Sequence, residues 1–258
     1  AVSKNTYYRF LNETSYNWSK FLLLLAAKVT SRFDALARPE RVKVLDDSVV
    51  KRNRSKSVEL LARVYDHVEH KFQKGFTLLT LGWSDGYSFI PVGFNLLSSA
   101  KKNNRYNEIS ENIDHRTNGY KFRKESMMSK TDAAVLLIQR TLQSGINADY
   151  LLMDTWFTTE PMIRSVLDTG LAVIGMVKQL KQRYTYKGKK YTLHKLKRMV
   201  RFEGAKNIFG SLVVTTKTGI PVKIVFVRNR NKKSECLYLL NTDVSLSDTE
   251  IVRIYGNR

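Results

Sequence analysis

Segments with helical spacing alternate with short apolar runs between residues 131 and 177, and this alternation restricts the possible folds more than any other feature of the sequence. The spacing predicts helices over 131–142 and 158–167, and buried strands over 150–153 and 171–177. Helices that alternate with short apolar strands are typical of a sheet whose faces are covered by helices. We therefore expect an α/β fold for this region.

The residues before this region predict a helical start, one strand, a second helix and a hairpin. The expected elements are a helix over 14–37 that ends before Pro39, a strand over 42–45, a helix over 57–73, and a hairpin of strands 76–83 and 87–94. The helix over 57–73 rests on apolar residues at three- and four-residue spacing, among them Leu60, Val64 and Phe72. The hairpin is expected to turn at Asp85 and Gly86, because an Asp-Gly pair between apolar runs favours a tight turn.

Two further regions interrupt the alternation of helix and strand. Residues 98–130 are polar and predict a long loop or insertion, whereas residues 183–242 contain short alternating strands separated by turn-forming residues. We expect four parts along the chain: an N-terminal helical segment over 1–40, a core over 41–178, a β-rich basic insertion over 179–247, and the start of another helix over 248–258.

The charge of the chain is strongly unbalanced. Lys and Arg number 44 against 23 Asp and Glu, which gives a formal net charge of +21 and a pI of about 10.0. Residues 178–258 contain 19 Lys and Arg against 5 Asp and Glu, so the last third of the chain holds two-thirds of the excess. A surface this positive indicates a polyanionic partner, with nucleic acid as the first candidate and a ribosomal or acidic-membrane partner as the alternative.

Cysteine usage and hydropathy exclude several classes of protein. The single cysteine, Cys236, excludes an internal disulfide and a zinc site built from several cysteines, and it fits a reducing cytoplasm. The longest apolar run, residues 21–27, is too short to cross a bilayer, and no signal segment is expected. We expect a cytoplasmic protein with no membrane partner.

An aspartate closes an apolar strand at two places in the chain. Val44 and Leu45 are followed by Asp46 and Asp47, and the strand over 150–153 is followed by Asp154. Either aspartate alone could be only a helix cap or a turn former. The order of the predicted elements is, however, that of the ribonuclease-H-like (retroviral-integrase-like) fold. In this order a strand with an acid is followed by a hairpin, a helix, a second strand with an acid, another helix and a further strand. In that order the acids end adjacent strands, where they would bind Mg²⁺ or Mn²⁺ through oxygen ligands.

Cations next to aromatic residues mark two candidate DNA-binding segments. The basic run 51–56, with Lys51, Arg52 and Arg54, directly follows the first acids and is expected to contact phosphates. The second segment mixes cations with rings that could stack on unpaired bases. Its members are Lys181, Arg183, Tyr184, Tyr186, Lys187, Lys189, Lys190 and Tyr191. The alternative for this second segment is a solvated hairpin whose tyrosines pack inward.

Four segments together, 44–48, 65–67, 81–86 and 151–159, resemble bacterial insertion-sequence transposases of the DDE type. The group that they resemble is typified by insertion sequence four and carries a Tyr-Arg-Glu-Lys signature. Tyr255 and Arg258 match the first two residues of that signature at the correct spacing, and its Glu and Lys would fall after residue 258. The resemblance therefore implies a chain that is cut off before its catalytic Glu.

The resemblance also implies roles for individual residues. Asp154 would be the second catalytic, metal-binding aspartate. Asp47 would be the first, because the family's aspartate is usually followed directly by Ser or Thr, and Asp46 is the alternative. Tyr255 and Arg258 would contact phosphate near the cleaved strand. The cofactor would be Mg²⁺ or Mn²⁺.

The activity implied by the resemblance is DNA transposition, in which an endonuclease cuts DNA at the ends of an insertion sequence and joins them to a target. The partners would be double-stranded DNA, both terminal repeats and target, and a second copy of the chain in a synaptic homodimer. The location would be the bacterial cytoplasm, at the nucleoid. Without the catalytic Glu, this chain is expected to bind DNA and not to cut it. Two other interpretations stay open: a non-catalytic DNA-binding protein derived from such an enzyme, and a ribonuclease-H-like nuclease.

Overall fold

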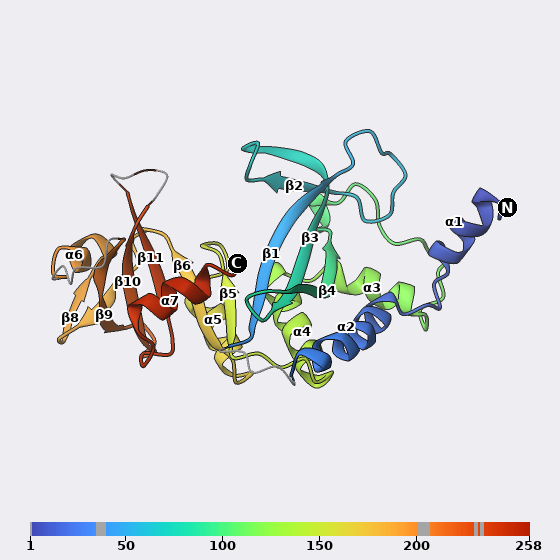
Figure 1. Cartoon of the computed structure of the whole chain (residues 1–258). Helices are drawn as coiled ribbons and strands as arrows, with labels where there is room; N and C mark the ends of the chain where they lie inside the picture. The colour runs from blue at the N-terminus through green and yellow to red at the C-terminus, as the bar shows by residue number, and fades with distance from the viewer. Residues whose placement is uncertain (1, 35–39, 201–206, 230–231, 233–234) are drawn as a thin grey trace. The chain divides into compact units, whose positions relative to one another are not determined.

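The computed structural model describes residues 2–34, 40–200, 207–229, 232 and 235–258 (Figure 1). The chain forms two compact units, each assembled from separated stretches of sequence. Unit 1 contains residues 1–35, 46–81 and 91–146, and unit 2 contains residues 36–45, 82–90 and 147–258. Strand β1 (Val42–Lys51) therefore contributes its first four residues to unit 2 and the others to unit 1.

Unit 1 combines helices with one group of strands. Its elements are α1 (Lys4–Asn12), α2 (Trp18–Asp34), the later part of β1, β2 (Ala62–Asp66), most of β3 (Lys71–Ser84) and of β4 (Phe89–Leu97), the 3-10 helix η1 (Lys102–Asn104), α3 (Asn118–Glu125) and α4 (Lys130–Gln143). The strand order is β2-β3-β1, and β4 pairs with β3. The predicted polar stretch over 98–130 is mainly loop, with η1 and α3 inside it.

Helix α2 confirms the first predicted helix in part. The Asn17 side chain accepts a hydrogen bond from the N–H of Lys20 at 2.8 Å, and this cap makes α2 begin at Trp18, four residues later than predicted. The predicted end of that helix and Pro39 fall on residues 35–39, which lie outside the described residues. A separate helix, α1, precedes it.

The predicted hairpin and the predicted helix over 131–142 are both confirmed. In the turn between β3 and β4, Asp85 Oδ1 accepts hydrogen bonds from the N–H groups of Tyr87 and Ser88, at 3.1 and 2.7 Å. Helix α4 starts slightly earlier than predicted because the Ser129 side chain accepts the N–H of Asp132 and caps the first turn.

The helix predicted over 57–73 is wrong. Residues in this stretch form β2 and the start of β3, an antiparallel pair in which Tyr65 lies opposite Phe72. Every second residue of β2 is buried, as expected for a strand with one face on a core. The backbone leaves helical geometry at Leu60 and His70, whose φ angles of 56° and 52° lie in the left-handed region.

Unit 2 is built mainly on strands. Its elements are the first part of β1, the tip of the β3–β4 hairpin, β5 (Tyr150–Met153), α5 (Glu160–Leu167), β6 (Ala172–Val177), β7 (Tyr184–Tyr186), β8 (Lys189–Tyr191), α6 (Leu193–Lys197), β9 (Ile208–Thr215), β10 (Pro221–Arg228), β11 (Cys236–Asn241) and α7 (Asp248–Tyr255). The strands predicted over 150–153 and 171–177, the helix predicted between them over 158–167, and the helix from 248 are confirmed. Within the described ranges, no helix is both long enough and apolar enough to cross a membrane.

Parallel and antiparallel strands adjoin in unit 2. Strand β5 pairs in parallel with β1 on one side, where Leu152 lies opposite Val44, and with β6 on the other, where it lies opposite Ile174. Strand β11 then pairs antiparallel with β6, followed in order by β10, β9, β7 and β8. The β-rich segment therefore extends the sheet of unit 2 from the edge of β6.

Helix α7 covers one face of this sheet (Figure 1). Its Ile251 and Ile254 are buried in one apolar cluster with Val44, Leu152 and Leu239. Because helices cover it, β5 is apolar throughout instead of alternating, as is usual for parallel strands. This packing fixes the first residues of β1, and β5, relative to α7.

Candidate active site

Asp154 directly follows β5, whose last three residues are fully buried. Its Oδ1 accepts hydrogen bonds from the N–H groups of Trp156 and Phe157, at 2.9 and 3.1 Å. The carboxylate therefore shapes the turn that leads into α5, as the turn-forming interpretation predicts. Its other oxygen, Oδ2, has no hydrogen-bond partner among the described residues, so the same side chain can also accept an external ligand.

The turn after Asp154 is tightly packed against β6. The Thr158 hydroxyl donates to the Asp154 carbonyl oxygen at 2.5 Å. A Cβ at Gly175 of β6 would lie only 2.3 Å from Thr158 Oγ1, so this position admits glycine alone without a shift. The close approach fixes the turn and, through it, the position of the carboxylate.

The two candidate first acids have different surroundings. Asp47 accepts a hydrogen bond from the Lys130 ammonium at 3.0 Å, in an ion pair whose side chains are only 15% and 17% exposed. Asp46 is exposed, and its Oδ1 accepts the N–H of Asp47 at 2.9 Å. Since neighbouring residues of a strand face opposite sides, only one of them can share the face of Val44.

Lys43 is a buried cation in the same strand. Its side chain has no exposed surface, and it lies opposite Leu151 of β5. Burial lowers the pKa of Lys43 to about 7, because the charged form loses its hydration.

The C-terminal end of α7 reaches the end of β5. The Tyr255 hydroxyl donates to the Met153 carbonyl oxygen at 3.2 Å, one residue before Asp154. At the opposite end of α7, Ser247 and Glu250 form a reciprocal capping box that lowers the pKa of the Glu250 carboxyl. Arg258 is exposed, three residues after Tyr255.

The two predicted DNA-binding segments differ in how their charges are matched. The ammonium of Lys51 forms ion pairs with Asp66, at 3.2 Å, and with Glu69, and these bonds, that with Glu69 first, raise the pKa of Lys51. Arg52 and Arg54 are exposed. The cation of Lys51 thus already has carboxylate partners within unit 1.

Lys187, Lys189 and Lys190 lie on the exposed β7–β8 hairpin. Lys187 and Gly188 form its turn, with φ angles of 48° and 75°. Tyr184 packs inward and is 1% exposed, and burial raises its pKa to about 12. For this tyrosine the inward-packing alternative holds.

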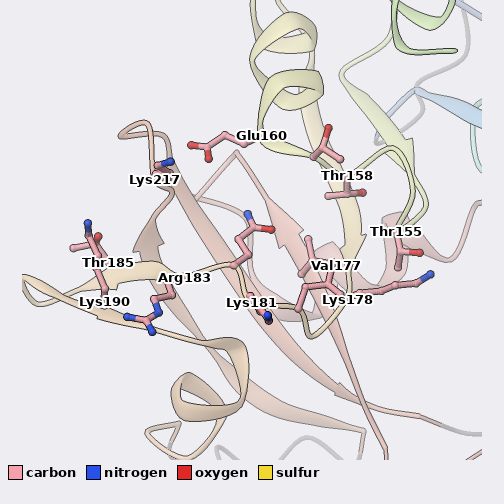
Figure 2. Close-up of a pocket in the computed structure, with 13 residues that line it drawn as sticks. Thr155, Thr158, Glu160, Val177, Lys178, Lys181, Arg183, Thr185, Lys190 and Lys217 are labelled. Carbon is pink, nitrogen blue, oxygen red and sulfur yellow. The ribbon is translucent and has the colours of Figure 1, made fainter. Parts of the chain in front are cut away.

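A hollow of about 450 Å³ lies beside the Asp154 turn, entirely within unit 2 (Figure 2). We call it the basic hollow. Its lining residues are Thr155, Thr158, Thr159, Glu160, Val177, Lys178, Leu180, Lys181, Gln182, Arg183, Thr185, Lys190 and Lys217. Five are cations and one is an acid. They come from the start of α5, the end of β6, the segment after it, the β7–β8 hairpin and the turn after β9 (Figure 2).

Sequence reasoning found three of these five cations, Lys181, Arg183 and Lys190, and missed Lys178 and Lys217. The position of Lys178 in the sequence could have indicated its place, since it directly follows β6 as Asp154 directly follows the adjacent parallel strand β5. The sequence gives no such indication for Lys217, because its place depends on how β9 and β10 extend the sheet.

A metal site is not complete among the described residues. They contain no group of three or more His, Cys, Asp or Glu side chains that could hold a metal ion. Asp46, Asp47 and Asp154 are therefore candidates for part of such a site.

The fold and these acids define a class. A mixed α/β architecture in which β1, β5 and β6 run parallel, and a hairpin and helix lie between β1 and β5 in the chain, is ribonuclease-H-like. Asp154 directly follows β5 as predicted, but Asp46 and Asp47 lie within β1, which continues to Lys51 instead of ending at these acids. Residues 1–189 match the family described as DDE superfamily endonuclease, and because the match covers more than half of the chain, the chain belongs to that family.

The chain is also similar to a solved structure, "Drosophila P element transposase strand transfer complex". The sequence identity is 11% and the TM-score 0.29, and the similarity covers 77% of this chain and 42% of that one. No curated protein matches the chain.

Proposed function

We propose that this chain is a transposase that cuts DNA at the ends of an insertion sequence and joins those ends to a target. Membership of the DDE superfamily endonucleases supports a nuclease of the transposase type. The formal net charge of +21 supports a nucleic-acid substrate. The cytoplasmic, nucleoid-associated location in a bacterium belongs to the same proposal.

Acids within β1 and directly after β5, two strands that pair in parallel, carry this proposal. Val44 lies opposite Leu152, and both pack under α7. Asp154 follows Leu152 by two residues, and Asp46 follows Val44 by two. Residues two apart in a strand face the same side, so Asp46 continues the face of Val44 within β1.

We propose that Asp46 is the first catalytic aspartate, in place of Asp47, which the usual order of residues in the family favours. Asp47 occupies the opposite face of β1, where the Lys130 ammonium neutralises it. A carboxylate that already neutralises a largely buried lysine is a poor ligand for a metal cation.

The donor set fits a hard divalent cation. Asp46 and Asp154 would hold Mg²⁺ or Mn²⁺, which prefer carboxylate oxygens. Such an ion would supply activation of a water or a 3′ hydroxyl and neutralise charge at the phosphorus. The chain itself holds the Asp154 carboxylate in place through the turn N–H groups and the Thr158–Gly175 packing. A third carboxylate is needed, and Glu250 does not suit this role because the capping box ties it to the far end of α7.

We further propose the subgroup with the Tyr-Arg-Glu-Lys signature, action as a homodimer on paired ends, and phosphate contacts by Tyr255 and Arg258. The contact between Tyr255 and the end of β5 supports the proposed phosphate contact. The Tyr255 hydroxyl reaches the carbonyl next to Asp154, so a phosphate at that acid would lie beside the tyrosine.

The test is DNA cleavage by the full-length protein. A plasmid carrying the repeats that flank its gene is incubated with Mg²⁺ or Mn²⁺, and nicked and joined products are measured. We expect Asp154→Asn to reduce cleavage to the level without metal, while DNA affinity stays the same or increases slightly, because a negative charge facing phosphate is removed.

Asp46→Asn and Asp47→Asn are the matched pair, since they are adjacent and remove the same charge. Asp46→Asn should behave like Asp154→Asn, and Asp47→Asn should keep measurable cleavage. The reverse result would restore Asp47 as the first acid. Wild-type cleavage by Asp154→Asn would overturn the proposed site, and DNA binding without any cleavage would favour a non-catalytic DNA-binding protein.

A further inference from the structure

The basic hollow contains more positive charge than the chain itself neutralises. Lys178, Lys181, Arg183, Lys190 and Lys217 line it, and none of these five forms a salt bridge with a carboxylate in the described part of the chain. Some cations elsewhere do have carboxylate partners, such as those of Lys51, Lys130 and Arg140. Converging like charges repel each other, and a bound anion relieves that repulsion.

Glu160, the one acid that lines the hollow, forms hydrogen bonds with a neighbouring turn. The Glu160 carboxylate accepts hydrogen bonds from the N–H and the hydroxyl of Thr218, each at 2.6 Å. It thereby ties the start of α5 to the turn between β9 and β10. The wall that carries Lys217 is held in place by this contact.

The hollow has the size and the lining of a site for unpaired nucleotides. Its volume of about 450 Å³ lies within the range of pockets that enclose small molecules, so it admits a nucleotide but not a base-paired duplex. Val177, Leu180 and the threonine methyl groups supply apolar surface for a base. The cations and the hydroxyl groups of Thr155 and Thr158 supply partners for a phosphate.

A second hollow, of about 540 Å³, continues from the first. The two share Thr155, Val177 and Lys178. The second adds the cation of Lys197, the imidazole of His194 and the carboxylate of Glu235, which forms an ion pair with Lys232. A path lined by positive charge thus passes Thr155, which is the residue after Asp154.

From this geometry we propose that the basic hollow binds an unpaired DNA strand by its phosphates and delivers it to Asp154. The proposal rests on the proposed function, since it makes the hollow the single-strand subsite of that nuclease. It adds Lys178 and Lys217 to the DNA-binding residues and separates their role from that of cations on the outer hairpin.

The test compares two triple variants of the full-length protein, each with three charges fewer in unit 2. The hollow variant, Lys181→Gln with Arg183→Gln and Lys217→Gln, removes three of the five cations that line the hollow. Lys187→Gln, Lys189→Gln and Lys195→Gln remove exposed charge outside it and serve as the control. Binding is measured by fluorescence anisotropy with a labelled 12-nucleotide DNA strand and with the blunt duplex of the same sequence, over a range of salt concentrations.

We expect the hollow variant to bind the single strand at least about tenfold more weakly than the control variant does, with a salt slope smaller by about two, since each lost phosphate contact on a single strand removes about 0.7. Duplex binding should fall less in the hollow variant than in the control variant, because the hollow does not admit a duplex and the exposed cations that the control variant loses remain in the hollow variant. Equal losses of single-strand binding in the two variants, or no single-strand binding by the wild type, would overturn the proposal. Circular dichroism and the melting temperature show whether both variants are folded.

Two further arms separate the possible failures. An RNA strand of the same sequence that binds more tightly than the DNA strand, with the same loss in the hollow variant, would assign the hollow to RNA and overturn the DNA assignment. Cleavage by Asp154→Asn is measured separately. If that variant cuts normally while the hollow variant loses the single strand, the proposed active site fails and the strand-binding hollow stands.

Discussion

At the scale of single residues, Gly175 shows how one missing side chain can position a catalytic candidate. Its Cα lies so close to Thr158 that an added Cβ would be 2.3 Å from the hydroxyl oxygen. The same hydroxyl holds the carbonyl of Asp154. A substitution at position 175 should therefore affect the position of Asp154, although the two residues lie on different elements.

We expect Gly175→Ala to lower the free energy of unfolding by about 1 to 3 kcal/mol, the usual cost of overpacking a tight core. Adding Thr158→Ala should restore part of this loss, because it removes the atoms that the new methyl group meets. Urea unfolding of the two single variants and the double variant measures the coupling. Strictly additive effects would contradict a direct contact.

Lys43 gives a prediction on pH. Its pKa is 10.5 when exposed and about 7 when buried, so between these values the unfolded chain binds more protons than the folded one. Stability from this group therefore rises as the pH increases from about 7 to about 10, and is constant below 7, where both states are protonated.

We expect the melting temperature of the wild type to rise between pH 7 and pH 10 relative to that of Lys43→Met, which has no such group. Thermal unfolding at pH 6, 7, 8, 9 and 10 measures the difference between the two chains. Parallel profiles over this range would mean that Lys43 is not a buried titrating group.

At the scale of elements, the segments that the sequence predicted well are those whose burial is uniform. Strands β5 and β6 are largely buried, so their sequences are unbroken apolar runs. The run of β5 marked the position of Asp154, and the order of elements and the family resemblance then made it a candidate. The helix predicted over 57–73 is wrong because the apolar residues there fit a period of 3.6. The left-handed φ angles at Leu60 and His70, which break helical geometry, cannot be recognised from the sequence. The basic hollow was predictable only in part, because strands distant in sequence form its walls.

The capping box at the N-terminus of α7 gives a further prediction. The Ser247 hydroxyl accepts the N–H of Glu250, and the Glu250 carboxylate accepts the N–H of Ser247. We expect Ser247→Ala to lower the free energy of unfolding by about 1 kcal/mol and to speed hydrogen exchange over residues 248–258. Thr249→Ser is the control: it keeps the hydroxyl that lies 3.1 Å from the Ser247 hydroxyl and should change the exchange little. Equal exchange in wild type and Ser247→Ala would rule out the cap as the support of α7.

At the scale of the whole molecule, some cations form ion pairs with carboxylates and others do not. If about six cations engage phosphates, log K for duplex DNA should fall with log salt at a slope of about −5. Replacing Lys187, Lys189 and Lys190 by Gln should flatten that slope by up to about three. Filter binding or anisotropy at several salt concentrations measures it, and an unchanged slope would return the hairpin to ordinary solvated surface.

Lys51→Gln is the informative contrast for the same measurement. Because Asp66 and Glu69 already pair with Lys51, we expect the salt slope to change by less than about half a unit. A change of a full unit would mean that the ion pairs open to let Lys51 reach a phosphate, as the sequence alone predicted.

The division of β1 between the two units has a consequence for the order in which the chain is made. Leu152 leaves the ribosome 108 residues after Val44, the residue that it must pair with. At usual rates of synthesis this is a delay of about 5 to 20 s. During that time the growing chain holds an apolar strand edge with no neighbour, the kind of edge that invites pairing with another molecule. Translation speed over the intervening hundred residues should therefore influence how much of this protein is recovered folded.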